Sequence, residues 1–162
     1  MSATDEFVRN NQSYAAQFDS GHLPTPPRKQ VTVVTCMDSR MDIFAILGLS
    51  NGEAHIIRNA GGVVTDDVIR SLAISQRKLQ TREIIVIQHT QCGMLTFTDD
   101  EFREELRLET GMKPPWSPES FSDLDSEVRS SLKRIRNSAF IQHKNVRGFV
   151  YDVDTGRLRE VS

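Results

Sequence analysis

Two short segments built almost entirely from β-branched and aliphatic residues constrain the fold of this chain most. They are Val31–Thr35 and Glu83–Ile87, and we expect a third short strand between them at Ala54–Arg58. A continuously apolar strand is typically buried on both faces, as the strands of a parallel sheet are. We therefore expect an α/β fold in which helices flank a mainly parallel sheet.

Helix-forming sequence lies between and after these strands. Thr65 is placed to cap a helix, and Thr98 with Glu101 three residues later has the pattern of a capping box. The helices that we expect run from Met41 to Leu47, from Thr65 to Leu79, from Thr98 to near Gly111, and from Asp123 to Arg136.

The end of the chain has the pattern of a β-hairpin. We expect a strand at Gly148–Val153, a turn at Asp154–Gly156 and a second strand at Arg157–Val161. The parallel part of the sheet is expected to have the strand order 2-1-3-4, and the hairpin to add an antiparallel strand at its edge.

The length of 162 residues suits one domain that covers the whole chain. Within it, residues 1–30 are expected to form an N-terminal arm, with a helix at Asp5–Phe18 followed by a connection that contains glycine and proline. The aromatic side chains of this helix, Phe7 and Tyr14 among them, would be poorly buried in a monomer. The arm therefore predicts a dimer or a larger assembly.

Composition and charge argue against several classes of protein. The net charge is −2 and the pI is about 6.1, whereas nucleic-acid-binding domains usually carry a basic face. No run of 18 apolar residues is present, so we expect no membrane span. The polar start at Met1–Val8 does not have the pattern of a signal peptide, and two cysteines are too few for a disulfide scaffold. We therefore expect a cytoplasmic protein.

Both cysteines of the chain, and one histidine, follow predicted strands. Cys36 comes directly after the first strand, and His89 and Cys92 follow the third. In an open α/β sheet with the expected order, the carboxyl ends of these two strands meet at the switch point where ligands bind. Two sulfurs and one ring nitrogen are a zinc donor set that leaves a fourth position open. Buried structural cysteines and a redox pair are the alternatives, although the chain has no Cys-x-x-Cys motif.

Asp38 and Arg40 lie two residues apart just after Cys36, so their side chains share one side of an extended segment. A guanidinium can hold a carboxylate by two parallel hydrogen bonds. Beside zinc, Asp38 would accept the proton of a bound hydroxide while Arg40 keeps the carboxylate away from the metal. Alternatively, Asp38 becomes the fourth ligand in a closed state, or the two residues form an ordinary surface ion pair.

Gly61 and Gly62 follow the second predicted strand. Because they have no side chains, their backbone N–H groups can approach a small anion closely, which makes them candidates for binding the substrate or another anion. An ordinary loop between a strand and a helix explains them equally well. Their spacing does not match a dinucleotide-binding fingerprint, so we expect no nucleotide cofactor.

Three segments together resemble the signature segments of the β-class carbonic anhydrases. They are Cys36–Arg40 (Cys-Met-Asp-Ser-Arg), Arg58–Gly62 (Arg-Asn-Ala-Gly-Gly) and His89–Gly93 (His-Thr-Gln-Cys-Gly). The resemblance is strong from Val31 to Met94 and weaker through the terminal hairpin. The short chain is most similar to the compact, cab-type branch of the family.

This resemblance implies that Cys36, His89 and Cys92 bind zinc and that Asp38 and Arg40 form the catalytic dyad. It also implies a homodimer, often paired into a homotetramer, with the N-terminal helix laid on the neighbouring subunit. The implied reaction is the reversible hydration of carbon dioxide to bicarbonate, by attack of a zinc-bound hydroxide.

Two other functions are open at this point. Some relatives of this branch have the same ligands but prefer carbonyl sulfide or carbon disulfide, so a hydrolase that uses the same zinc site is the first alternative. A non-catalytic, zinc-stabilised binding protein is the second. Asp38 and Arg40 argue against the second alternative, because a purely structural zinc site does not need them.

Overall fold

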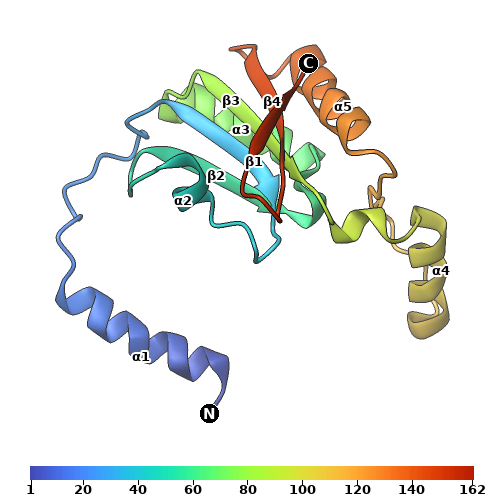
Figure 1. The fold of residues 1–162 in the computed structure, drawn as a ribbon, viewed down its shortest axis with the longest axis horizontal. Helices are drawn as coiled ribbons and strands as arrows, with labels where there is room; N and C mark the ends of the chain where they lie inside the picture. The colour runs from blue at the N-terminus through green and yellow to red at the C-terminus, as the bar shows by residue number, and fades with distance from the viewer.

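The computed structural model describes residues 1–162 and contains one five-stranded sheet flanked by helices (Figure 1). The strand order is β2-β1-β3-β4-β5; the first four strands are parallel and β5 is antiparallel to β4. The predicted fold class, strand order and antiparallel edge strand are confirmed. The strands are β1 (Val31–Cys36), β2 (Ala54–Asn59), β3 (Glu83–His89), β4 (Asn145–Tyr151) and β5 (Leu158–Val161).

Two helices begin at the predicted caps, whereas the N-terminal helix runs from Ala3 to Ala16 instead of the expected Asp5 to Phe18, because Ser2 caps it. The Thr65 hydroxyl accepts the Val68 N–H, and Thr98 and Glu101 form the expected capping box. The predicted helix at Met41 instead begins at Ile43, because the Asp42 side chain caps it. The helices are α1 (Ala3–Ala16), α2 (Ile43–Leu47), α3 (Asp66–Leu79), α4 (Asp99–Thr110) and α5 (Leu124–Asn137).

The sheet separates two hydrophobic clusters because neighbouring residues of a strand point to opposite faces. On one face, Val34 packs with residues of α3 and α5, such as Leu72 and Leu132. On the other face, Val33 packs with α2 and with the segments that follow the strands, including Ile43 and Met94. This second cluster also contains both cysteines. The carboxyl ends of the strands are therefore joined to the core on the α2 side.

β4 begins at Asn145, three residues before the predicted start at Gly148. Val146 is buried whereas Asn145 and Arg147 are exposed, so the first part of the strand alternates instead of being continuously apolar. Gly148 lies where β4 meets α5: a Cβ at this position would be 2.3 Å from Cγ1 of Val128. The glycine therefore allows α5 to pack closely on β4.

The N-terminal helix α1 lies apart from the sheet, at the end of an extended connection (Figure 1). None of its residues is buried. Phe7 is 64% exposed, and Tyr14 is 60% exposed. Tyr14 contacts Phe18 within the arm, but these aromatic side chains are poorly buried in the single chain, as the sequence suggested. No helix has the length and apolar character needed to cross a membrane.

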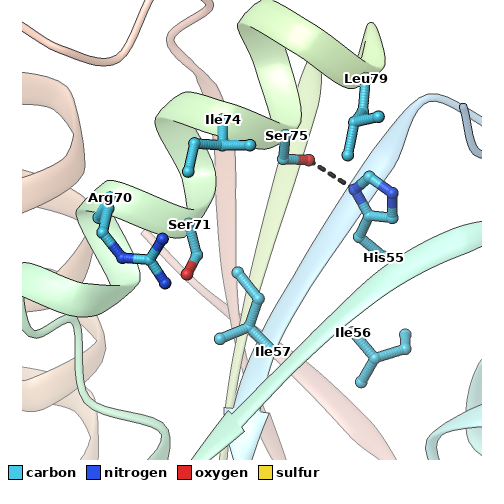
Figure 2. Close-up of a pocket in the computed structure, with 8 residues that line it drawn as sticks. All are labelled: His55, Ile56, Ile57, Arg70, Ser71, Ile74, Ser75 and Leu79. Atoms are coloured by element: carbon cyan, nitrogen blue, oxygen red, sulfur yellow. Dashed lines mark hydrogen bonds between the residues drawn. The ribbon is translucent and has the colours of Figure 1, made fainter.

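A cavity of about 360 Å³ lies between α3 and β2, towards the amino-terminal end of the strand (Figure 2). His55 points into it, and its Nδ1 lies 2.7 Å from the Ser75 hydroxyl. That hydroxyl also contacts the hydroxyls of Thr32 and Thr81, each at 2.7 Å. Ser75 is 4% exposed, so this His–Ser pair stabilises the packing of α3 on β2 and does not present a nucleophile.

Candidate metal centre

Cys36, His89 and Cys92 come together at the carboxyl ends of β1 and β3. Their ligand atoms all lie within 4.8 Å of one another. The side chains are buried, with exposed fractions of 5% for Cys36, 0% for His89 and 2% for Cys92. The parallel register explains the meeting, because Thr35 pairs with Ile87 and each cysteine or histidine lies just beyond this pair. The three residues that the sequence singled out therefore form one buried cluster able to bind a metal ion.

The orientation of His89 suits a metal ligand. Its Nδ1 lies 2.7 Å from the carbonyl oxygen of Thr90, and because a carbonyl only accepts, Nδ1 carries the ring proton. Nε2 then has a free lone pair. This atom is buried and has no hydrogen-bond partner. Since buried polar atoms are normally paired, an orphaned imidazole nitrogen facing two sulfurs fits a bound cation.

The two cysteine side chains of the cluster interact with each other. The contact with Cys92 lowers the pKa of the Cys36 thiol to about 4. The same contact raises the pKa of Cys92 far above its ordinary value, with burial acting in the same direction. The backbone at Asp38 and Gly61 also lowers the pKa of Cys36. A divalent cation would favour the deprotonated form of both cysteines and be bound by both thiolates.

Asp38 and Arg40 form a bidentate pair beside the cluster. Arg40 donates from Nε to Asp38 Oδ1 at 2.9 Å and from Nη2 to Oδ2 at 2.7 Å. These bonds hold the pKa of Asp38 well below its ordinary value. Asp38 Oδ2 lies 3.7 Å from His89 Nε2, and its side chain is only 16% exposed. The pair therefore adjoins the candidate metal position and is more than a remote surface ion pair.

Arg58 fixes the segment that carries Cys36 and Asp38. From β2 it donates to three carbonyl oxygens of this segment: that of Cys36 at 2.8 Å, that of Asp38 at 2.8 Å and that of Met41 at 3.0 Å. Sequence reasoning did not predict this role of Arg58, whose only signal in the sequence is its place at the start of the Arg-Asn-Ala-Gly-Gly segment.

Gly61 and Gly62 bring a turn close to the end of β1. Their φ angles are +80° and +61°, in the left-handed region that favours glycine. A Cβ on Gly62 would lie 2.7 Å from the carbonyl carbon of Thr35. The Asn59 side chain closes the turn by bonding both the N–H and the carbonyl of Val63. The turn thus has a packing role next to Cys36, and its predicted use in anion binding stays a prediction.

An apolar cavity of about 470 Å³ lies beside the cluster. Met37 and Met94 line it near the cluster residues, and Phe97, Phe102 and Trp116 form an aromatic wall. Cys36, His89 and Cys92 do not line it. The cavity is therefore a neighbour of the candidate centre and not its mouth.

The fold and the cluster together define a class: an open α/β protein with a two-thiol, one-imidazole metal-binding centre at the carboxyl ends of neighbouring strands. Comparison with known families agrees with this class. The family model described as carbonic anhydrase matches residues 31–158. The chain belongs to the β-carbonic anhydrase family.

Two kinds of enzyme occur among the similar proteins. The chain is 57% identical over 163 residues to beta-carbonic anhydrase 1 of Mycobacterium tuberculosis, covering 100% of this chain and 99% of that protein. It is 36% identical to a carbon disulfide hydrolase of an Acidianus species, over 96% of this chain and 87% of that protein. The crystal structure of a carbonic anhydrase from Streptococcus mutans matches with a TM-score of 0.94 and 46% identity, covering 100% of this chain and 99% of that one.

Proposed function

We propose that this protein is a zinc enzyme that catalyses the reversible hydration of carbon dioxide to bicarbonate. The observation that carries the proposal is the buried cluster of Cys36, His89 and Cys92, whose orphaned imidazole nitrogen lies 3.7 Å from the Asp38 carboxylate. The 57% identity to a β-carbonic anhydrase over the whole chain supports the same reaction.

Cys36, His89 and Cys92 would hold the zinc ion. Three protein ligands leave a fourth tetrahedral position open, which is the usual arrangement in a catalytic zinc site. Zinc bound in this way lowers the pKa of a coordinated water towards about 7 and makes it a nucleophile at neutral pH. The Thr90 carbonyl keeps His89 in the tautomer that presents Nε2 to the cluster.

Asp38 would orient the nucleophile. Because Arg40 depresses its pKa, Asp38 is an acceptor-only carboxylate at neutral pH. It can then accept a hydrogen bond from the O–H of the nucleophile. This bond would direct a lone pair of the nucleophile's oxygen at the substrate carbon. The pairing with Arg40 supports the open arrangement, in which Asp38 is no ligand. Arg40 is thus a positioning residue in this proposal.

Hydrolysis of carbon disulfide or carbonyl sulfide at the same site is the second candidate. It is favoured by the 36% identity to a carbon disulfide hydrolase over 96% of the chain. Carbon dioxide and these molecules are all linear and electrophilic at carbon, and an apolar wall discriminates one such change by only about 1–3 kcal/mol. The residues that hold the metal and orient the nucleophile would serve either reaction.

The experiment that tests the proposal measures zinc content first and then three reactions on one preparation. We expect about one zinc per chain and a kcat/KM for carbon dioxide, from stopped-flow assays, above the values for carbonyl sulfide and carbon disulfide. A larger value for a sulfur substrate would assign the protein to the second candidate. Bound zinc without any turnover would support the non-catalytic binding protein.

We also propose that the protein is cytoplasmic and forms a homodimer or a larger assembly. The support for assembly is α1, whose aromatic side chains stay largely exposed although Tyr14 contacts Phe18.

A further inference from the structure

Arg40 is held from two sides, and only one of them is Asp38. On the other side, Nη2 donates to the main-chain carbonyl oxygen of Gln91 at 2.8 Å, and Nη1 makes a longer contact of 3.5 Å with the Gln91 side-chain oxygen. Gln91 lies between the cluster residues His89 and Cys92. The guanidinium therefore bridges the segment after β1 and the segment after β3.

Gln91 is itself held by the terminal hairpin. Its side-chain nitrogen donates to Asp154 Oδ2 at 2.8 Å. Asp154 is fixed in turn, because Thr90 bonds the same hairpin twice: the Thr90 N–H donates to the Tyr151 carbonyl, and the Thr90 hydroxyl accepts the Val153 N–H. A continuous series of contacts thus runs from the hairpin through Gln91 to Arg40.

Gln91 has a strained backbone conformation, and its hydrogen bonds to Arg40 and Asp154 explain why this conformation persists. Its φ angle is +54°, in the left-handed region that costs a residue with a side chain free energy. Such a conformation persists where the surrounding contacts determine it. Here it accompanies the carbonyl that accepts from Arg40 and the side chain that reaches Asp154.

The position of Arg40 decides what Asp38 can do. Asp38 Oδ2 is the oxygen nearest to His89 Nε2, at 3.7 Å, and it is also the oxygen that Arg40 Nη2 holds. With a metal ion held by the cluster, this oxygen would be the nearest Asp38 atom available as a fourth ligand. The hydrogen bonds to Arg40 oppose such binding, so whatever fixes Arg40 also favours the open arrangement.

We propose that Gln91, braced by Asp154, is a positioning residue that locks Arg40 on the Asp38 carboxylate and so keeps the fourth metal position open. The inference rests on the proposed function, because it needs a metal in the cluster. It gives the β4–β5 hairpin a role at the site: a contact made by its turn shifts the balance between the open and closed arrangements.

The test uses the Co²⁺-substituted protein and azide, an anion that binds at an open metal position and changes the visible spectrum. Asp154→Asn and Asp154→Ala remove the same charge, but only the amide retains an acceptor for Gln91. We expect Asp154→Ala to bind azide about two- to fivefold more weakly than Asp154→Asn, because apparent affinity follows the fraction of open protein. Gln91→Asn tolerates the backbone conformation but is one methylene shorter, and it should bind azide more weakly than the wild type.

Three controls make the outcome decisive. All variants should hold one Co²⁺ per chain and keep the melting temperature of the wild type, since Gln91 and Asp154 are exposed. Glu160→Gln removes a carboxylate from the same hairpin that pairs with Arg147 instead, and should leave azide binding unchanged. Equal azide affinity in Asp154→Ala, Asp154→Asn and Gln91→Asn would overturn the inference alone. A wild-type protein that takes up no Co²⁺ at the cluster would overturn the proposed function and the inference with it.

Discussion

At the scale of single residues, the imidazole of His89 and the two cysteine side chains of the cluster are in different environments. His89 is fixed by a carbonyl so that Nε2 remains free, whereas the two cysteines contact each other and the contact lowers the pKa of Cys36. The unpaired buried nitrogen is costly without a cation, because a buried acceptor normally has a partner. Removal of one ligand should therefore affect metal binding and folding together.

Substitution Cys92→Ser tests this coupling. We expect zinc affinity to fall by more than about 100-fold, since even residues that only support metal ligands change affinity by roughly 10–100-fold. The melting temperature should fall as well, because metal binding contributes to folding. Metal analysis and thermal denaturation measure both quantities. Wild-type protein stripped by a chelator should melt like the variant; a variant that keeps full zinc would remove Cys92 from the ligand set.

Substitution Asp38→Asn separates metal binding from turnover. The amide has nearly the same shape, but it cannot act as a purely accepting carboxylate, so the nucleophile would lose its orientation. We expect zinc content to stay at about one per chain and kcat to fall by about 10²–10⁴-fold. Stopped-flow hydration and metal analysis on one preparation check this. Wild-type rates in this variant would mean that Asp38 and Arg40 form only a structural ion pair.

At the scale of elements, the carboxyl ends of β1, β2 and β3 each supply a different part of the site. β1 leads to Cys36 and Asp38, β2 supplies Arg58 as a clamp on that segment, and β3 supplies His89. The other end of β2 has no such chemistry: His55 there packs under α3 (Figure 2). This difference between the two ends follows from the parallel sheet, whose carboxyl ends all face the same way.

The packing of α3 on β2 should depend on pH through His55. Burial lowers the pKa of His55 below its usual value of about 6.5. Below pH 6.5 the unfolded chain therefore binds a proton that the folded chain does not, so acid favours unfolding. We expect the melting temperature to fall between pH 7 and pH 5, and His55→Gln to reduce this dependence. If the melting temperatures of the wild type and His55→Gln differ by the same amount at every pH in this range, His55 is not the cause of the pH dependence.

At the scale of the whole molecule, α1 extends away from the rest of the chain (Figure 1). An isolated 14-residue helix is only marginally stable in water. A partner surface that covers Phe7 and Tyr14 would stabilise it, which is the physical reason to expect assembly.

Sedimentation equilibrium tests the assembly. We expect a dimer or larger species at micromolar concentration. Phe7→Asp should raise the dissociation constant at least about tenfold, because it would remove a large apolar side chain from the proposed interface. Gln12→Asp adds the same charge at another exposed position of α1 and should have a smaller effect. A wild-type protein that sediments as a stable monomer would refute the expectation.

The sequence by itself predicted the order of the strands, the approximate positions of the helices and the three cluster residues. It could do so because these depend on local patterns and on one rule of parallel sheets: residues that follow neighbouring strands meet at one edge. Cys36, His89 and Cys92 needed no knowledge of loop conformation to be placed together. The spacing of Asp38 and Arg40 was likewise enough to predict their pairing.

Only the tertiary structure decided the contacts that hold these residues in place. Arg58 reaches three carbonyls, and Gln91 bridges Arg40 and Asp154, because of the register of β2 and the path of two loops. Neither residue has a local pattern that reveals its partners, which lie 20 and 63 positions away in the chain. The early start of β4 at Asn145 could not be predicted for a related reason. The helix packed against a polar segment decides which of its residues are buried. Local pattern therefore predicted the donors, and long-range packing determined how they are oriented.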